Sequence, residues 1–183
     1  MIRFLDFLFA AFGIIALSPL FLLICLLGFW ETGSPIFIQT RVGKSKSLFQ
    51  MYKFRTMRVG TKSVATHLAD TSSVTPLGRI LRSTKLDELP QLINVLKGEM
   101  SLVGPRPCLP NQFELIEARE QRGIFYFRPG ITGLAQIRGI DMSNPAYLAS
   151  VESEMLSNFN WRRYIYYIFS TFNRNALADR VRQ

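Results

Sequence analysis

The feature of this sequence that most limits its possible folds is an apolar stretch near the N-terminus. It reads FLDFLFAAFGIIALSPLFLLICLLGFW from Phe4 to Trp30 and contains one charged residue, Asp6. As one straight helix it would be roughly 40 Å long, more than the roughly 30 Å hydrocarbon core of a membrane requires. No small-residue cleavage site follows it, and bulky Ile24 precedes Cys25, where a lipoprotein signal needs a small residue. We expect the segment to stay in the protein and to lie in a membrane.

The pair Ser18-Pro19 interrupts this stretch near its middle. Pro19 lacks a backbone N–H and its ring crowds the carbonyl of Ile15, so the helix is expected to kink there, with the Ser18 hydroxyl available to the freed carbonyl. A strong kink would return the chain to the face it entered, and a weaker one would leave a single kinked span. Basic residues occur on both sides of the stretch, namely Arg3, Arg41, Lys44 and Lys46. The positive-inside rule therefore leaves both topologies open.

Length and charge suit one domain plus this apolar segment. The chain has 183 residues and a formal net charge of +9, which indicates an anionic partner: nucleic acid, an anionic membrane surface or a phosphorylated small molecule. Its two cysteines, Cys25 and Cys108, do not suggest a disulfide framework and fit a reducing compartment. With His67 as the single histidine, the sequence favours a hard cation such as magnesium over zinc.

Beyond the apolar stretch the pattern is that of an α+β domain that is mostly helical. Residues 34–43 and 47–57 read as two short strands that form a hairpin, and residues 61–74 as a mobile loop. Residues 75–98 read as two helical pieces, with Pro90 in the first turn of the second and Gly98 at its end.

Three further segments complete this part of the chain. Residues 111–123 are expected to form an amphipathic helix, and residues 134–139 a short strand or loop. The aromatic and arginine-rich residues 161–183 suit a helix at the level of lipid headgroups, and ordinary core packing with a basic outer face is the alternative.

The adjacent acids Asp87 and Glu88 lie in a markedly basic part of the chain. They could simply stabilise the start of the following helix, which is the commonest reason for acids at that position. They could also be catalytic, because one carboxylate can attack a phosphoryl group while a second holds magnesium. A phosphate-bearing substrate would then be attracted by the basic side chains of Lys53, Arg55, Arg82 and Arg106. Local chemistry alone does not assign the two roles.

Longer motifs accompany the acid pair: KFRTM (53–57), TPLGRILRSTKLDELPQLINVLKGEMSLVGPRP (75–107) and RPGITGLAQ (128–136). In these motifs, in their order and in the break at Ser18-Pro19, nearly the whole sequence resembles the bacterial sugar transferase family, the small monotopic phosphoglycosyl transferases. The resemblance implies a re-entrant membrane helix over residues 1–30. It further implies a small cytoplasmic α/β catalytic domain with interfacial amphipathic helices over residues 31–183.

The resemblance also implies an activity. A family member transfers a phosphosugar from a UDP-sugar to a polyprenol phosphate, here expected to be undecaprenyl phosphate, and releases UMP as the first membrane step of glycoconjugate assembly. The aspartate of the pair, here Asp87, is expected to carry the phosphosugar covalently, and Glu88 to help bind Mg²⁺. The enzyme would lie on the cytoplasmic face of the bacterial inner membrane, in contact with phospholipid of the inner leaflet.

Substrate-binding residues follow from the same motifs. The segment Pro105-Arg106-Pro107 resembles the family's nucleotide- or phosphate-contacting loop, with rigid flanks that fix the direction of the arginine. Lys53, Arg82 and Gln91 match family positions near the active site.

The sequence departs from the family pattern in two places. Ile2-Arg3 stands where many members have Lys-Arg, and LAQIRGID (134–141) stands where many read WAQVNGR. The second departure leaves the transferred sugar unassigned, and the oligomeric state is not predicted.

Two other classes of function are possible on charge alone. A non-catalytic scaffold could bind anionic lipid through its basic face, but lipid binding gives no reason for the acid pair. Nucleic-acid binding has only the net charge in its favour, because the sequence contains no recognition module of a known type. We therefore expect an enzyme that does not bind nucleic acid.

Overall fold

The computed structural model describes residues 1–61 and 71–173 of the chain. Most of the loop predicted over residues 61–74 lies outside the described residues. The same is true of the part of the C-terminal helix predicted beyond Asn173.

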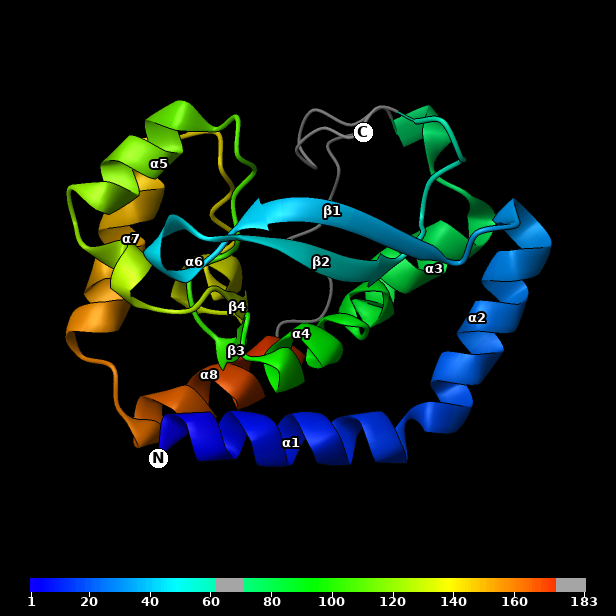
Figure 1. The fold of residues 1–183 in the computed structure, drawn as a ribbon, viewed down its shortest axis with the longest axis horizontal. Helices are drawn as coiled ribbons and strands as arrows, with labels where there is room; N and C mark the ends of the chain where they lie inside the picture. Colours follow the sequence, from blue (N-terminus) through cyan, green and yellow to red (C-terminus); the bar gives the residue numbers. More distant parts are fainter. Residues whose placement is uncertain (62–70, 174–183) are drawn as a thin grey trace.

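The apolar stretch forms two helices, α1 (Ile2–Ala16) and α2 (Ser18–Thr32), which are bent by 63° relative to each other. Among the described residues no single helix has the length and apolar composition to cross a membrane, whereas this bent pair taken together does. In Figure 1, α1 runs along one edge of the protein and α2 turns away from its end along a second side.

Proline and serine chemistry explains the bend, which was predicted at this point. Leu17 separates the two helices, and Pro19 occupies the first turn of α2, where its missing N–H breaks no helical hydrogen bond. The hydroxyl of Ser18 donates to the carbonyl of Ile15 at 2.8 Å, as expected from the sequence. The predicted kink is therefore confirmed as the start of a new helix.

After α2 the chain forms short strands interspersed with helices. The strands are β1 (Ile36–Val42), β2 (Leu48–Phe54), β3 (Ser101–Val103) and β4 (Gly130–Thr132). The further α-helices are α3 (Pro76–Thr84), α4 (Gln91–Lys97), α5 (Phe113–Glu120), α6 (Leu134–Ile137), α7 (Pro145–Ser157) and α8 (Trp161–Asn173). Short 3-10 turns lie between them at Lys44–Lys46, Thr71–Ser73, Leu86–Glu88 and Ile124–Tyr126.

The four strands found in residues 1–61 and 71–173 form two separate pairs. β1 and β2 make the predicted hairpin, antiparallel, with Ile36 opposite Phe54 and Val42 opposite Leu48. β3 and β4 are parallel and short, with Val103 opposite Thr132. This second pair was not predicted, because three-residue strands carry little periodicity.

A glycine permits the close approach of the chain segments beside β3 and β4. A Cβ on Gly130 would lie 2.0 Å from the backbone nitrogen of Gly104, which is far inside any allowed contact. Backbone bonds fix the approach, because the N–H of Gly130 donates to the carbonyl of Pro105 at 2.8 Å. The segment of Pro105 is thereby held against β4.

The two helical pieces predicted over residues 75–98 are confirmed as α3 and α4. Thr75 caps α3, because its hydroxyl accepts from the N–H of Gly78 at 3.0 Å. Gly98 ends α4 in the left-handed conformation that glycine adopts without strain. Lys85 is also left-handed, with φ 58°, and redirects the chain between α3 and the turn at Leu86–Glu88.

Two expectations for the C-terminal half need correction. Residues 134–137, predicted as a strand or loop, form helix α6. The expected amphipathic helix is present as α5, but its buried positions include charged Arg119 beside Leu115. The partner that makes this burial possible is Glu152, in a helix that we did not predict, α7.

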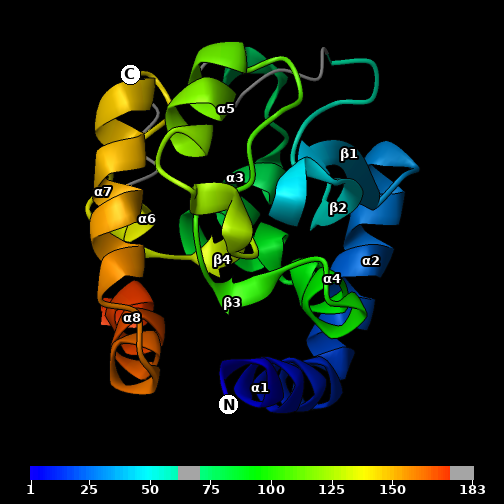
Figure 2. The same ribbon diagram turned by 60° about the vertical axis from the view of Figure 1, so that its left-hand side comes forward.

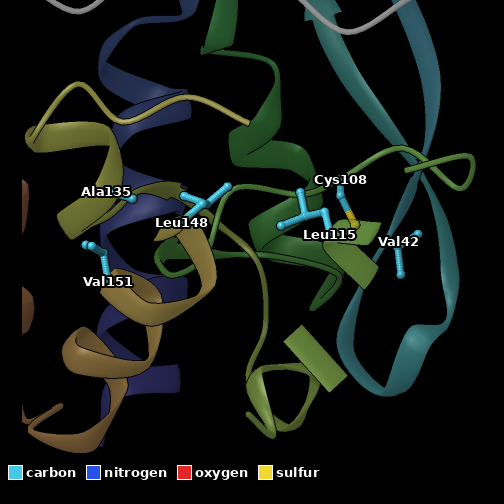
Figure 3. Close-up of a cluster of buried hydrophobic side chains, with 6 residues drawn as sticks. All are labelled: Val42, Cys108, Leu115, Ala135, Leu148 and Val151. Atoms are coloured by element: carbon cyan, nitrogen blue, oxygen red, sulfur yellow. The ribbon is translucent and has the colours of Figure 1, made fainter. Parts of the chain in front are cut away.

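The core of this half joins segments that are distant in the sequence. Figure 3 shows the buried cluster, which consists of Val42, Cys108, Leu115, Ala135, Leu148 and Val151. It links the end of β1 to α5, α6 and α7. Figure 2 shows α5 and α7 on the opposite side of the protein from α2.

Polar contacts attach the apolar helix α1 to the rest of the protein. The carboxylate oxygen Oδ1 of buried Asp6 accepts from the hydroxyls of Ser101 (2.8 Å) and Tyr164 (2.9 Å) and from the N–H of Leu102 (2.9 Å). Arg3 donates to the last turn of α4, where Nη1 lies 2.6 Å from the carbonyl oxygen of Val95. The N-terminal part of α1 is therefore fixed to β3, α4 and α8.

Candidate active site

The acid pair lies in the tight turn between α3 and α4. Asp87 and Glu88 are consecutive residues of the 3-10 turn Leu86–Glu88, and both side chains are half-buried. Consecutive positions project in different directions, so the two carboxylates can serve different purposes. The left-handed residue Lys85 directly precedes the pair.

Glu88 is held between two cations from distant segments. Its Oε1 accepts from Nζ of Lys53 at 3.2 Å and from Nη2 of Arg106 at 3.3 Å. Lys53 lies on β2 and Arg106 in the loop that follows β3. Although burial opposes its charge, Lys53 and Arg106 lower the pKa of Glu88 to about 2. Glu88 is therefore ionised at neutral pH.

A small pocket lies against this ion cluster. It is lined by Arg41, Met51, Lys53, Glu88, Gln91, Arg106, Pro107, Gly130 and Ile131. Its free volume of about 10 Å³ is that of one water-sized group. Three cations and one carboxylate line it, so the pocket carries a positive balance that favours an anion.

The structure brings together several of the predicted site residues. Lys53, Gln91, Arg106 and Pro107 line the same pocket as Glu88, although they come from different parts of the sequence. Pro105 lies directly before Arg106, and its carbonyl accepts from Gly130. Asp87 is not among the residues that line the pocket, and it adjoins this group through its sequence neighbour Glu88.

The predicted residues Arg55 and Arg82 make other contacts. Arg55 donates through Nε to the carbonyl of Ser34 at 2.7 Å, and its guanidinium lies over the ring of Phe37. Arg82 donates through Nε to the hydroxyl of Thr56 at 2.9 Å. Neither arginine is among the lining residues of the pocket. Their substrate-binding roles stay predictions.

Arg41 lines the pocket but was not predicted as a site residue, since in the sequence it is only one of several basic residues after the apolar stretch. It is 7% exposed and donates from Nη1 to the carbonyl of Pro107 at 3.1 Å. Burial and the nearby charge of Arg106 lower its pKa to about 10. The strand sequence gave one weak indication of this buried position, because Gln39 and Arg41 occupy alternate, inward-facing positions of β1 while Ile38 is exposed.

The backbone of the Pro-Arg-Pro loop is held at every carbonyl. The carbonyl of Pro105 accepts from the N–H of Gly130, and that of Arg106 accepts from Nη2 of Arg119. The next two carbonyls, of Pro107 and Cys108, accept from Nη1 of Arg41 and from the N–H of Val42. Such a loop has little freedom, so the direction of the Arg106 side chain toward Glu88 is set in advance.

Arg119, which supports Arg106, is paired with Glu152 inside the protein. Nε of Arg119 donates to Oε2 of Glu152 at 2.8 Å, and the side chains are 2% and 1% exposed. Burial works against the charge of Arg119, but the carboxylate of Glu152 outweighs it and raises the pKa of the arginine. Sequence reasoning missed this pair because its members lie on different helices.

The residues present are compatible with magnesium when the substrate contributes ligands. The described residues contain no group of three or more histidine, cysteine, aspartate or glutamate side chains that could hold a metal ion by themselves. Magnesium is usually bound by one or two carboxylates together with substrate phosphates. Glu88 supplies one ionised carboxylate beside a pocket that favours anions, and its Oε1 already accepts from Lys53 and Arg106.

The family model described as bacterial sugar transferase matches residues 1–177. The exopolysaccharide production protein ExoY of Sinorhizobium fredii is 35% identical over 196 residues, covering 96% of this chain and 85% of that protein. The UDP-glucose:undecaprenyl-phosphate glucose-1-phosphate transferase of Caulobacter vibrioides is 45% identical over 143 residues, covering 75% of this chain and 54% of that protein.

A further relative carries a different sugar in its name. The UDP-N-acetylgalactosamine-undecaprenyl-phosphate N-acetylgalactosaminephosphotransferase of Aeromonas hydrophila is 39% identical over 143 residues, covering 74% of this chain and 33% of that protein. This chain thus spans most of the length of ExoY and about half or less of the two named transferases.

Proposed function

This chain belongs to the bacterial sugar transferase family, and from that membership we propose that it transfers a phosphosugar from a UDP-sugar to a polyprenol phosphate and releases UMP. The acceptor is undecaprenyl phosphate, as in the names of two relatives. The reaction would begin the assembly of a lipid-linked glycan. Its sugar stays unassigned, because those two names differ in the sugar.

The observation that carries this proposal is that Glu88, one member of the acid pair, lines a cationic pocket, with Asp87 directly before it in the chain. Glu88 is ionised between Lys53 and Arg106, and Asp87 adjoins it. A diphosphate attracted to the pocket would come within reach of an adjacent carboxylate. A lipid-binding scaffold would gain nothing from acids at this point.

The proposed reaction consists of two successive displacements at the sugar-linked phosphorus atom. A carboxylate oxygen of Asp87 bonds to the sugar-linked phosphorus, and the bond from that phosphorus to the bridging oxygen breaks, so UMP departs with the electron pair. An oxygen of the polyprenol phosphate then bonds to the same phosphorus and displaces Asp87 as a free carboxylate. The sugar phosphate ends on the lipid.

The neighbouring side chains hold the substrate and its charge. Lys53 and Arg106 would bind oxygens of the donor diphosphate, and the fixed backbone of the Pro-Arg-Pro loop would keep Arg106 in place. Glu88 would hold Mg²⁺, which would neutralise charge on the phosphate oxygens when bound. Arg55 and Arg82 would contribute more distant positive charge.

The contacts of α1 support a re-entrant membrane segment. Arg3 and Asp6, near the start of α1, bond to α4, β3 and α8, and the segment after α2 leads directly into the hairpin. Both ends of the bent pair therefore adjoin the same body of the protein. We place residues 1–30 in the inner leaflet of the bacterial inner membrane and residues 31–183, the catalytic part, on the cytoplasmic side.

Exposed apolar side chains support contact with phospholipid. On α1 they include Phe4, Phe12 and Ile15, and on the neighbouring α8 Tyr166 and Phe169. Figure 1 shows these two helices together along one edge of the protein. Arg162 and Arg163 at the start of α8 would meet lipid phosphates. The alternative of ordinary core packing with a basic outer face does not explain these exposed apolar side chains on α8.

Assay of UMP release tests the proposed function. The purified full chain is incubated with undecaprenyl phosphate, magnesium and each member of a panel of UDP-sugars. We expect UMP with one or a few donors, abolition by EDTA, and loss of turnover in Asp87→Asn. Glu114→Gln, at an exposed position of α5, is the matched control and should keep full activity. A wild-type protein that binds lipid but gives no UMP with any donor would support the scaffold instead.

A further inference from the structure

Two buried nitrogen atoms at the pocket have no hydrogen-bond partner. Within residues 1–61 and 71–173, Nε of Arg41 and Nε2 of Gln91 are buried and unpaired. The two residues are 7% and 2% exposed, and both line the pocket beside Glu88. Oε1 of Gln136 is also unpaired, but Gln136 is not among the residues that line the pocket.

The other two guanidinium nitrogens of Arg41 are hydrogen-bonded, so only Nε is left to bind a ligand. Nη1 donates to the carbonyl of Pro107 and Nη2 to Oε1 of Gln39. The guanidinium is therefore fixed in position by its far end. Unpaired buried donors are rare in folded proteins because they destabilise the fold. Two of them at one pocket indicate a ligand that supplies an acceptor.

The chemistry of the pocket restricts that ligand. Both unpaired atoms are donors, so the ligand must present an acceptor, and a free volume of about 10 Å³ has room for a water-sized group such as one oxygen atom. Arg41, Lys53 and Arg106 face one carboxylate, Glu88. A water molecule would satisfy the donors but leave this positive charge uncompensated, whereas an oxygen of a phosphate would do both.

We propose that Arg41 and Gln91 form a subsite that takes one phosphate oxygen of a substrate, with Nε of Arg41 and Nε2 of Gln91 as its donors. The inference rests on the proposed function, which supplies two phosphate-bearing substrates, the UDP-sugar and the polyprenol phosphate. The oxygen enters the pocket, and the rest of the phosphate lies over its mouth near Lys53 and Arg106.

Three substitutions remove the donors in different ways. Gln91→Glu keeps the shape but presents a carboxylate to the phosphate, and Gln91→Met removes the donor without adding charge. Arg41→Lys keeps the charge but loses the rigid fork that places Nε. Gln121→Glu makes the same change of charge as Gln91→Glu at an exposed position near the end of α5 and is the matched control.

Equilibrium binding to the full chain in nanodiscs separates the two sources of phosphate. We expect Gln91→Glu and Arg41→Lys to weaken binding of one probe, either UDP or undecaprenyl phosphate, by roughly tenfold or more, since hydrogen bonds to charged groups are lost. Gln91→Met should show a smaller loss and Gln121→Glu none. Weaker UDP binding assigns the subsite to the donor, and weaker undecaprenyl phosphate binding assigns it to the acceptor. Unchanged affinity for both probes in all three variants would overturn the inference.

A measurement on the wild type removes dependence on the folding of the variants. In ¹⁵N-labelled protein, the resonances of Arg41 Nε–H and of the Gln91 side-chain amide should shift when UDP or inorganic phosphate is added. Resonances that stay unmoved at saturating concentrations of both would contradict the subsite.

The outcomes also separate this inference from the proposed function. A wild type that releases UMP, with no shift and no change of affinity in the variants, refutes the subsite alone. A wild type that never releases UMP, but whose Arg41 and Gln91 resonances respond to phosphate, refutes the proposed transfer and supports the phosphate subsite.

Discussion

Arg119 and Glu152 form an ion pair enclosed in the protein, with Nε of the arginine 2.8 Å from Oε2 of the glutamate and with side chains that are 2% and 1% exposed. The same guanidinium donates through Nη2 to the backbone carbonyl of Arg106 at 2.9 Å. The pair thus connects helices α5 and α7 to the Pro-Arg-Pro loop, whose Arg106 side chain contacts Glu88. Because both charges are buried, the loss of one partner should lower the stability of the fold.

Breaking this buried pair should destabilise the fold strongly. Arg119→Met leaves the carboxylate of Glu152 buried without its partner, at an expected cost of about 3–5 kcal/mol in the free energy of unfolding. The double variant Arg119→Met/Glu152→Leu should cost less than the single variant, because no unpaired charge remains. Denaturant unfolding of the purified proteins in detergent gives both values.

The exposed pair Arg138–Glu154 serves as its control. These side chains are 41% and 52% exposed, so Arg138→Met should cost less than about 1 kcal/mol. Equal losses in Arg119→Met and Arg138→Met would show that burial of the first pair has no energetic consequence.

Glu88 should make stability depend on pH in the acid range. Its pKa in the folded protein is about 2, below the roughly 4.3 of an unfolded glutamate. The stabilisation is therefore complete above about pH 4.3 and is lost as the pH falls toward 2. The difference in melting temperature between wild type and Glu88→Gln should be large at pH 7 and should shrink toward pH 3. A difference that is constant over this interval would mean that the Glu88 carboxylate is not stabilised by Lys53 and Arg106.

The hydrogen bond between Tyr164 and Asp6 should stabilise the attachment of α1. Tyr164→Phe removes one of three donors to the buried carboxylate, at an expected cost of roughly 1 kcal/mol or more. Asp6→Ala should cost more, since it leaves the Ser101, Leu102 and Tyr164 donors unpaired. Tyr166→Phe, at a tyrosine that is 63% exposed, is the control and should be neutral in the same unfolding experiment. A neutral Asp6→Ala would mean that these bonds do not hold α1 in place.

The bend at Ser18-Pro19 should determine the topology of the N-terminus. A cysteine is added before Met1 in a background of Cys25→Ala and Cys108→Ala. When Ser18 and Pro19 are retained, this cysteine should react with a thiol reagent present on the cytoplasmic side of the membrane. Replacing Ser18 and Pro19 with leucine should straighten the helix and move the added cysteine to the periplasmic side. Periplasmic labelling of the unmodified segment would exclude the re-entrant arrangement.

Local signals in the sequence predicted much of the fold. Pro19 marked the break between α1 and α2, and periodic leucines with Gly98 at the end marked α4. These features depend on residues close in the chain. Helix α6 was misjudged because residues 134–137 form barely one turn, too short for a helical period to be recognised.

The site was less accessible to sequence reasoning, because its partners are distant in the chain. The motifs predicted Lys53, Glu88 and Arg106 as site residues, and in the structure Glu88 contacts both cations. Arg41 gave only the weak signal of its inward-facing, alternate position on β1, and Arg119 gave none, since the partners of both are carbonyl groups of the Pro-Arg-Pro loop that only the tertiary fold brings near. For Arg55, the sequence likewise did not reveal the nearby carbonyl of Ser34 that it contacts.

Intact-protein mass spectrometry with the donor alone tests the proposed mechanism most directly. If Asp87 is the nucleophile, the full chain incubated with magnesium and the UDP-sugar that supports turnover, without lipid, should gain the mass of one phosphosugar and release an equal amount of UMP. Asp87→Asn should gain nothing, whereas Glu88→Gln should gain the same mass more slowly. A wild-type protein that turns over with undecaprenyl phosphate but never gains this mass without it would contradict the covalent role of Asp87.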